Sequence, residues 1–476
     1  VSLQFGPSYS RFSLELFGTQ AAATVDFDRN TFLLHRHLPA GQDFDTYGQL
    51  HNEARSLAAQ ARSTLADYIL TKAKLRQRGN PYGASIARAM EAFYVAGEPD
   101  SRTSGRLGAR SIEICERMGD LANFPPQETA PAPAIVYAAP SQPAPELLIL
   151  GATGFIGREV VRQLAAAGRR ARLLVRSAAA LPAELRTGPI EVVRGDLSSR
   201  EDLLRALDGV RSVLHLARAN VKTWADYQRY EIEATRRVAE CALEAQVERL
   251  VYTGTIDSYY AGRRAGVITE ATPLDPRIQS RNLYARAKAA SEQLLMALHR
   301  ERALPVVILR PGIVIGRGGS PFHWGVGMWW NDAVCQIWGD GTNKLPLVLV
   351  EDVARALLAA RFVPGLEGRS FNLVADPCLS AQEYLDALDR AAGIQIDRRP
   401  TPIFSFYWRD LLKYCVKIAL RHPERRLPSY RDWESRTQRA RFDCSAAKAA
   451  LDWRPSSDPE TLIRQGIEIP VHEFLA

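Results

Sequence analysis

The stretch LLILGATGFIGREVV, residues 147–161, decides the fold. A short apolar run leads into three glycines spaced three apart, Gly151, Gly154 and Gly157, and an amphipathic segment follows. The first glycine permits a tight turn, the second lets backbone amides approach a pyrophosphate, and the third lets a helix pack closely against the strand. The helix N-terminus adds N–H donors and a partial positive charge for the phosphates. We therefore predict a strand–turn–helix unit that binds a dinucleotide.

Strand-like and helix-like segments alternate after this turn, which is typical of a doubly wound, mostly parallel sheet. Glycines that serve only a tight turn are the alternative, but they would not explain the further strand–helix units. We expect strands in RARLLV, IEVVRGD, SVLHLA, ERLVYTGT and PVVILRP, and helices from Ile156, in SREDLLRAL, around Tyr230 to Ala245 and from Leu283 to Arg300. The predicted fold class is α/β, with a Rossmann-type doubly wound parallel sheet at 147–320 and a small C-terminal substrate-binding region with helices at 321–476.

Two charged residues follow the second and third predicted strands. Arg176 ends the second strand, where an NAD-specific site usually places an acid for the ribose hydroxyls. A guanidinium there can clamp a 2′-phosphate with two hydrogen bonds, so we expect NADP as the cofactor, with NAD as the alternative. Arg176 could instead stack on the adenine or face solvent. Asp196 is expected to accept the adenine amino group, or else to cap a helix near Leu197.

A candidate proton-transfer set lies at the end of the fifth predicted strand and on the helix that follows it. Tyr284 and Lys288 lie four residues apart in NLYARAKAASEQLL and share one face of the predicted helix. A phenol with a pKa of about 10 is a poor base at neutral pH, but an adjacent ammonium favours the phenolate. Thr255 ends a strand at the edge where ligands bind, so its hydroxyl can bind the substrate oxygen while Tyr284 exchanges its proton. For this spacing alone, a packed tyrosine beside a snorkelling lysine is the alternative.

With these segments in this order, residues 147 to about 455 resemble the extended short-chain dehydrogenase/reductase family, the NAD(P)-dependent epimerase/dehydratase group. The matching segments are Gly151–Gly157, RGDL at 194–197, LHLA at 214–217, VYTGT at 251–255, YARAK at 284–288, LRPGIVIG at 309–316 and VEDVARALLAA at 350–360. The resemblance implies that Thr255, Tyr284 and Lys288 are catalytic, and that the segment after Pro311 lies beside the nicotinamide. The cofactor-binding residues that it implies are Gly151, Thr153, Gly154, Phe155, Ile156, Gly157, Arg176, Asp196, Leu197, Leu216, Ala217 and Pro311.

Two departures from the family pattern bear on the reaction. Glu231, in YEIEAT, stands where many members carry an active-site asparagine, which affects the proton relay. Thr255 is followed by Ile256 and Asp257 instead of the adjacent Asp-Glu pair of sugar-nucleotide 4,6-dehydratases. Elimination of water needs its own acid and base, so dehydration is disfavoured. We expect reversible hydride transfer at a secondary alcohol, by a reductase, a dehydrogenase or an epimerase.

The family resemblances favour a sugar nucleotide as the small-molecule substrate, used in polysaccharide or glycoconjugate biosynthesis. An aromatic cluster at 323–330, HWGVGMWW, is expected to line the substrate site, where it could stack on a base or an apolar ring. The alternatives are an NADP-dependent reductase or dehydrogenase of a hydrophobic, steroid- or flavonoid-like alcohol, and a non-catalytic dinucleotide-binding scaffold. The aromatic and basic stretch at 404–426 is expected to pack as a substrate-domain helix rather than on a lipid surface.

The residues upstream of the glycine turn have a different pattern. A proline-rich segment at 124–146 is predicted to form a semi-rigid linker. Before it, RFSLELFG alternates like a half-buried strand and ATVDFDRNTFLLHRH is typical of a hairpin. A long helix follows, with one apolar face, and shorter helices are predicted at 86–94 and 111–118. The expected apolar face comprises Ala54, Leu57, Ala58, Ala61, Leu65, Tyr68 and Ile69.

We therefore expect an α+β domain at 1–123. It weakly resembles the C-terminal substrate domain of the Gfo/Idh/MocA sugar oxidoreductases, through residues 14–27 and 108–118. That family places a dinucleotide-binding half before this domain, so the resemblance implies a truncated fusion partner that cannot catalyse alone. The alternative is an unrelated α+β interaction module.

Composition excludes several other classes. The chain has 61 Lys and Arg against 53 Asp and Glu, a formal charge of +8 that is spread along the sequence. This pattern favours small anionic ligands, and without a zinc-finger or RNA-binding signature we expect no nucleic-acid partner. The six cysteines have no metal-binding spacing, so we expect no metal site and a reducing compartment. With no bilayer-spanning apolar run and no secretion signal, the expected location is cytoplasmic, and a homodimer is compatible with the sequence.

Overall fold

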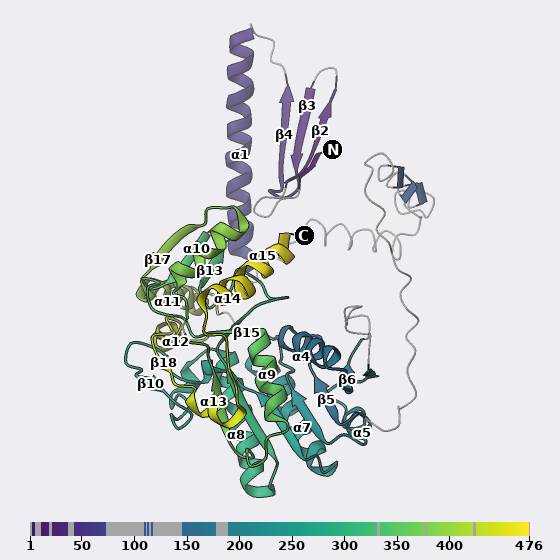
Figure 1. Ribbon diagram of the computed structural model, residues 1–476. Coiled ribbons are helices and arrows are strands. Elements are labelled where there is room, and N and C mark those ends of the chain that lie inside the picture. Colours follow the sequence, from purple (N-terminus) through teal and green to yellow (C-terminus); the bar gives the residue numbers. More distant parts are fainter. Residues whose placement is uncertain are drawn as a thin grey trace. The chain divides into compact units, whose positions relative to one another are not determined.

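The chain divides into two compact units in the computed structural model, Val1–Ala134 with Lys413–Arg426, and Ile135–Leu412 with Leu427–Ala476 (Figure 1). Residues 124–144 of the predicted linker at 124–146, the predicted helix at 86–94 and half of the one at 111–118 lie outside the described residues. The described residues are 2–4, 11–18, 21–36, 42–72, 109–110, 112–113, 116–117, 145–177, 189–330, 334–376, 378–421 and 425–475.

The larger unit is built on a seven-stranded sheet in which every strand pair is parallel. Its core strands are buried and mainly apolar, as expected when helices cover both faces. The predicted doubly wound parallel sheet is therefore confirmed. In spatial order the strands are β16 (Ser370–Leu373), β11 (Val306–Pro311), β9 (Arg249–Thr253), β8 (Ser212–His215), β5 (Leu147–Leu150), β6 (Ala171–Val175) and β7 (Ile190–Arg194).

Helices pack on both faces of this sheet and bury two separate apolar clusters. One face carries α4 (Phe155–Ala166), α9 (Val350–Ala360) and α13 (Ser445–Leu451), and α4 lies beside α9 (Figure 1). The other face carries α5 (Arg200–Leu207), α7 (Glu233–Glu244) and α8 (Leu283–Arg302). The short segments α6 (Trp224–Tyr227) and η4 (Gln228–Ile232) lead into α7, and η4 is a π-helical turn.

The strand order reverses between β5 and β8. From β5 the chain proceeds outward to β6 and β7, and then returns to β8 and continues in the opposite direction to β9 and β11. Two loops consequently diverge at the carboxyl ends of β5 and β8. In open parallel sheets a ligand crevice forms at this switch point.

The predicted boundary at residue 320 does not separate the sheet from the C-terminal region. Strand β16 and helix α9 follow residue 320 in sequence, yet β16 is an edge strand of the main sheet, because it pairs with β11. The C-terminal region also holds small sheets and helices: β12 (Ile313–Ile315) with β15 (Leu347–Leu349), β13 (Gly327–Trp330) with β14 (Val334–Trp338) and β17 (Asp397–Thr401), β10 (Val267–Ile268) with β18 (Arg441–Phe442), η5 (Ile256–Ser258), η6 (Ile278–Ser280), α10 (Ala381–Ala392), α11 (Ile403–Ala419), α12 (Tyr430–Ser435), α14 (Pro459–Ile463), η7 (Arg464–Glu468) and α15 (Ile469–Leu475).

The N-terminal unit contains an antiparallel sheet and one long helix. The strands are β1 (Ser2–Gln4), β2 (Arg11–Phe17), β3 (Ala21–Asp26) and β4 (Thr31–Arg36), in sequential order, and the helix is α1 (Gln42–Lys72). The predicted hairpin is present, with Asp26 opposite Thr31. Phe27, expected in the strand, instead lies in the turn, because the chain reverses between residues 27 and 30.

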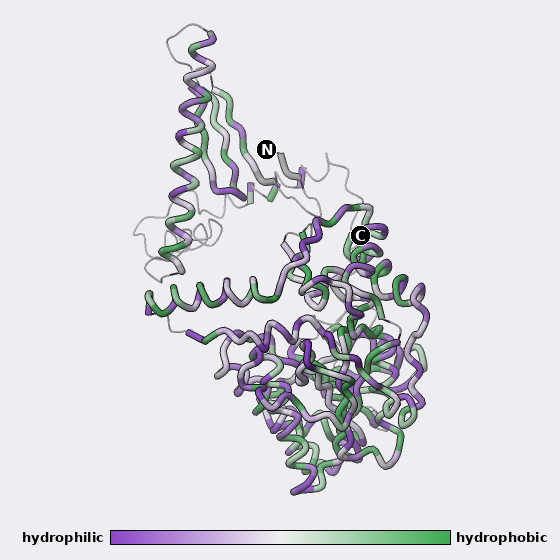
Figure 2. Tube along the Cα trace, turned by 90° about the vertical axis from the view of Figure 1, so that its left-hand side faces the viewer, coloured by the Kyte–Doolittle hydropathy of each residue, from purple (hydrophilic) through white to green (hydrophobic). Residues whose placement is uncertain are grey.

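The expected apolar face of α1 is not a buried face. Leu57, Leu65, Tyr68 and Ile69 are exposed, and Figure 2 shows hydrophobic and hydrophilic stretches alternating along this helix. The helix instead contacts β4 through polar groups: the Gln60 amide bonds both backbone groups of Phe32 at 2.7 and 2.8 Å, and Glu53 contacts His35 Nδ1 at 2.6 Å. Because β4 is an edge strand, its unpaired backbone groups are free to bond the Gln60 side chain.

No helix within the described parts of the chain is long and apolar enough to cross a lipid bilayer.

Candidate active site

The glycine turn between β5 and α4 leaves room only for backbone. Gly151 has a φ of +92°, and a Cβ there would lie 2.6 Å from the amide nitrogen of Ala217. A Cβ on Gly157 would lie 2.2 Å from the carbonyl oxygen of Gly151. Helix α4 starts after Gly154, and no side chain caps its first turn, so its leading N–H groups remain available. This cradle fits the pyrophosphate of a dinucleotide.

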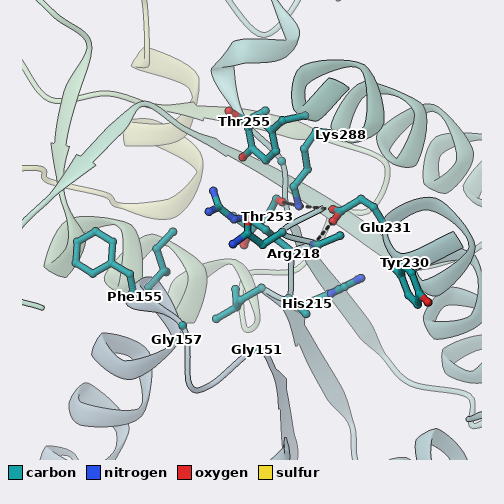
Figure 3. Close-up of a pocket in the computed structure, with 18 of the residues that line it drawn as sticks. Gly151, Phe155, Gly157, His215, Arg218, Tyr230, Glu231, Thr253, Thr255 and Lys288 are labelled. Carbon is teal, nitrogen blue, oxygen red and sulfur yellow. Dashed lines mark hydrogen bonds and ion pairs between the residues drawn. The ribbon is translucent and has the colours of Figure 1, made fainter. Parts of the chain in front are cut away.

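All fifteen residues predicted for cofactor binding and catalysis line one cavity of about 2100 Å³. It extends from the glycine turn across the carboxyl ends of β8 and β9 to α8 and the segment after β11. Figure 3 shows part of it, with Gly151, Gly157 and Phe155 on one side and Thr255 and Lys288 on the other. The lining includes Gly151, Thr153, Gly154, Phe155, Ile156, Gly157, Arg176, Asp196, Leu197, Leu216, Ala217, Thr255, Tyr284, Lys288 and Pro311.

The two charged residues at the cofactor end differ in how they are held. Arg176 is exposed at the end of β6. Asp196 accepts a hydrogen bond from the Ser198 amide at 2.7 Å, and the Ser198 hydroxyl together with this amide holds the pKa of Asp196 below its ordinary value. The helix cap near Leu197 that we considered for Asp196 is made by Ser199, whose hydroxyl accepts from the Asp202 amide. Asp196 therefore shapes the turn before α5 and does not cap that helix.

The start of α8 sets the position of the tyrosine. The Asn282 side chain accepts a hydrogen bond from the Ala285 amide at 2.9 Å and so caps the helix. Tyr284 consequently lies in the first turn and Lys288 one turn later. The guanidinium of Arg218 lies 5.6 Å from the centre of the Tyr284 ring, within cation–π range. Thr255 is buried, and its hydroxyl accepts from the Asp257 amide at 3.2 Å.

Lys288 is part of a buried ion pair. Its Nζ lies 2.8 Å from Glu231 Oε1, and the two side chains are 3% and 2% exposed (Figure 3). Burial alone would lower the pKa of Lys288, but contacts with Tyr252 and Glu231 hold it above its ordinary value. Nearby His215 is fully buried, and burial together with Lys288 lowers its pKa to about 3, so it is neutral at physiological pH.

Asp257, the acid nearest to Thr255 in sequence, is tied into a second buried network. Its carboxylate accepts hydrogen bonds from the Arg281 guanidinium at 2.7 Å and from the side-chain nitrogen of Asn282 at 3.0 Å. Arg281 is completely buried and also contacts Asp275 and Asp432. Burial opposes ionisation of Asp432, but Arg436 and Arg281 hold its pKa below the usual range. The network joins η5, the start of α8 and α12, and so supports the helix that carries Tyr284.

The far end of the cavity combines indole rings with hydrogen-bonding groups. Trp338 donates to the Trp324 carbonyl oxygen at 2.8 Å, and both line the wall. Arg436 lies 4.9 Å from the Trp433 ring, and its buried Nε has no hydrogen-bond partner. Gln438 Oε1 is likewise buried without a partner. These groups can receive an anionic or polar substrate group beside an aromatic surface.

Sequence reasoning missed Arg218, Arg436 and Gln438, and it did not foresee the partner of Lys288. Arg218 directly follows the matching segment LHLA, so its position at a strand end was an available signal. Arg436 and Gln438 come from a segment about 150 residues after Tyr284, and no local pattern marks them. Trp324 did belong to the aromatic cluster expected at the substrate site.

The glycine turn lies at the reversal point of a parallel sheet and opens into the cavity described above. This arrangement is typical of dinucleotide-binding α/β proteins. Residues 147–373 match the model of the NAD dependent epimerase/dehydratase family. Residues 147–373 are therefore similar to this family of NAD-dependent enzymes, as the motifs in this segment predicted. The match does not extend to residues 1–146, so the resemblance to Gfo/Idh/MocA proteins stays a prediction.

Individual proteins resemble the same part of the chain. The 2-alkyl-3-oxoalkanoate reductase of Shewanella oneidensis is 28% identical over 35% of this chain and 44% of its own length. The enzyme of the same name from Stenotrophomonas maltophilia is 27% identical over 52% of this chain and 76% of its own. A solved structure of MoeE5 in complex with UDP-glucose and NAD has a TM-score of 0.54 and 24% identity, covering 69% of this chain and 99% of that one. That last likeness concerns the fold.

Proposed function

We propose that the protein is an NADP(H)-dependent oxidoreductase or epimerase that catalyses reversible hydride transfer at a secondary alcohol. One observation carries the proposal: Thr255, Tyr284 and Lys288 line the same cavity as the glycine turn. A bound nicotinamide dinucleotide would supply the hydride chemistry. The pyrophosphate would be held by the N–H groups at the start of α4, from Phe155 to Gly157.

In this proposal Tyr284 exchanges a proton with the substrate oxygen, and the Thr255 hydroxyl orients that oxygen. The Lys288 ammonium favours the phenolate form of the tyrosine electrostatically. Dehydration is disfavoured because the Asp257 carboxylate is already bound by Arg281 and Asn282. It is therefore poorly suited to act as the extra acid or base that elimination requires.

A sugar nucleotide is the proposed substrate. The Trp324 and Trp338 wall offers a surface on which a base or sugar ring can stack, and Arg436 offers a donor to a phosphate. A second candidate, a hydrophobic oxo acid, is favoured by the same wall, since an alkyl chain can lie on the indoles while a carboxylate meets Arg436. The names of the two relatives described above support this second candidate.

A substrate panel separates the two candidates. The purified full chain is incubated with UDP-, GDP- and dTDP-sugars and, separately, with 2-alkyl-3-oxoalkanoates. Each reaction is scored for epimers and for NADPH consumption. Turnover of a nucleotide sugar supports the leading proposal. Turnover confined to the oxo acids would replace it with the second candidate.

The acid–base role is tested with Tyr284→Phe. We expect turnover to fall by about 10²- to 10⁴-fold, because the variant keeps the ring and lacks the exchangeable proton. NADPH affinity, measured by fluorescence titration, should remain nearly unchanged. Tyr430→Phe is a matched control, since Tyr430 lies on α12 and is exposed. Wild-type turnover in Tyr284→Phe would remove the catalytic assignment of Tyr284.

We also propose that the enzyme works in a reducing, cytoplasmic compartment. The cysteines in the described parts of the chain, which are Cys241, Cys335, Cys378, Cys415 and Cys444, carry free thiols. Burial raises the pKa of the Cys335 thiol to about 12, so this thiol is unreactive at neutral pH.

A further inference from the structure

The buried pair of Glu231 and Lys288 is more than a structural contact, because the ammonium is held by an ion pair and two hydrogen bonds. An ammonium has three N–H donors. Besides Glu231 Oε1, Lys288 Nζ contacts the Thr253 carbonyl oxygen at 3.1 Å and the Tyr252 hydroxyl at 3.3 Å. The side chain is therefore fixed from three directions. Such a charge is tolerated in the interior only when it is paired and hydrogen-bonded.

The second oxygen of the Glu231 carboxylate bonds a segment that lines the cavity. Glu231 Oε2 accepts a hydrogen bond from the Ala219 amide at 2.6 Å, in the segment that follows β8 (Figure 3). Residues 215–221 of this segment line the cavity opposite α8. One carboxylate on η4 thus joins the lysine of α8 to the loop at the reversal point of the sheet.

We propose that Glu231 is a positioning residue that holds Lys288 and the loop after β8 in place, while its negative charge offsets part of the ammonium's field at the Tyr284 phenol. This inference rests on the proposed role of Tyr284. A carboxylate bonded directly to the ammonium opposes its stabilisation of the phenolate. The electrostatic potential at the phenol therefore depends on both members of the pair.

Other titratable and charged groups surround the pair. They are His215 on β8, Arg218 after it, Tyr227 on α6, Tyr252 on β9 and Tyr284 itself. His215 is neutral, and burial raises the pKa of Tyr252 above its ordinary value, so Tyr252 stays protonated. Arg218 adds positive charge near the Tyr284 ring. Among the groups named here, Glu231 is therefore the one that carries a negative charge. Replacing it with a neutral residue should change the pH at which the Tyr284 phenol loses its proton.

The test follows the phenol directly and needs no substrate. The full chain is labelled with tyrosine carrying ¹³C at the ring carbon bound to oxygen, and the resonance that disappears in Tyr284→Phe is assigned to Tyr284. Its shift is recorded between about pH 6 and about pH 11. Removing the negative charge favours the phenolate, so in Glu231→Gln we expect the midpoint to move to lower pH by about one unit. Glu231→Asp keeps the charge and should keep the wild-type midpoint.

Glu244→Gln is the matched control, because Glu244 is exposed on α7 and pairs with Arg200. Circular dichroism checks folding, and Glu231→Asn provides a second neutral variant if Glu231→Gln does not fold. An unchanged Tyr284 midpoint in a folded neutral variant would overturn the inference. If Tyr284→Phe keeps full turnover, the proposed function fails instead, whatever the midpoint does.

Discussion

Arg176 is the residue on which the choice between NADP and NAD depends. It is exposed at the end of β6 and lines the cofactor end of the cavity. We expect the full chain to bind NADPH more tightly than NADH, because a guanidinium can bond the 2′-phosphate with two donors. In Arg176→Ala, NADPH affinity should fall by about tenfold or more while NADH affinity stays close to wild type. Fluorescence titration with each dinucleotide measures both values.

Arg211→Ala is the control for this change, since Arg211 precedes β8 and bonds Glu146 and Glu248 away from the cavity. Tighter binding of NADH than of NADPH by the wild type would refute the role given to Arg176. Equal losses for both dinucleotides in the variant would indicate a general effect on the fold.

Single residues also mark where sequence reasoning stops. Tyr284 and Lys288 were found because their spacing is local and helical. The partner of Lys288 was not found, since an acid 57 positions earlier in the chain gives no pairing signal. The same holds for Arg436 and Gln438. Their relation to the cavity arises from packing between segments, which no local pattern encodes.

Among the elements, the turn from β5 to α4 carries the sharpest steric constraint. We expect Gly157→Ala to lower NADPH affinity by about tenfold or more, because the new methyl group would meet the Gly151 carbonyl oxygen and force α4 away from β5. The overpacking should also lower the free energy of unfolding by about 1–3 kcal/mol. Titration with NADPH and urea unfolding measure the two effects.

Gly266→Ala offers a matched control, since a Cβ at Gly266 meets no atom within 4 Å. It should bind NADPH and unfold like the wild type. If Gly157→Ala binds NADPH normally, the close approach of α4 to β5 is not what forms the phosphate site.

The π-helical turn η4 shows why one helix was only partly predicted. A helix was expected around Tyr230 to Ala245, but helical structure begins at Trp224, and residues 228–232 form a π-turn before α7. An extra residue in such a turn breaks the 3.6-residue period. Glu231 lies in this turn and is buried. A regular helical period could not have shown that this acid reaches Lys288.

At the scale of the whole molecule, every residue that lines the large cavity lies between 151 and 438. We expect a fragment of residues 145–476 to fold and to bind NADPH with the affinity of the full chain, because it contains the seven-stranded sheet and both of its apolar clusters. Circular dichroism and NADPH titration of the fragment test this. The complementary fragment, residues 1–144, should bind no dinucleotide.

A folded 145–476 fragment that does not bind NADPH would show that the N-terminal unit contributes to the cofactor site. A fragment that does not fold would show that the two units depend on each other for stability. A homodimer is compatible with the sequence, and sedimentation of the full chain would test it.

Local patterns were sufficient for the class of fold and for most of the candidate site. The glycine spacing, the apolar strands and the Tyr284–Lys288 interval are short-range features, because turns, strands and helical faces depend on neighbouring residues. Packing set the rest. It placed Glu231 against Lys288, brought Arg436 and Gln438 to the cavity, and set the Gln60 side chain against the backbone of Phe32. These contacts join segments far apart in the chain, so their free energy depends on burial and hydrogen bonding that exist only in the folded protein.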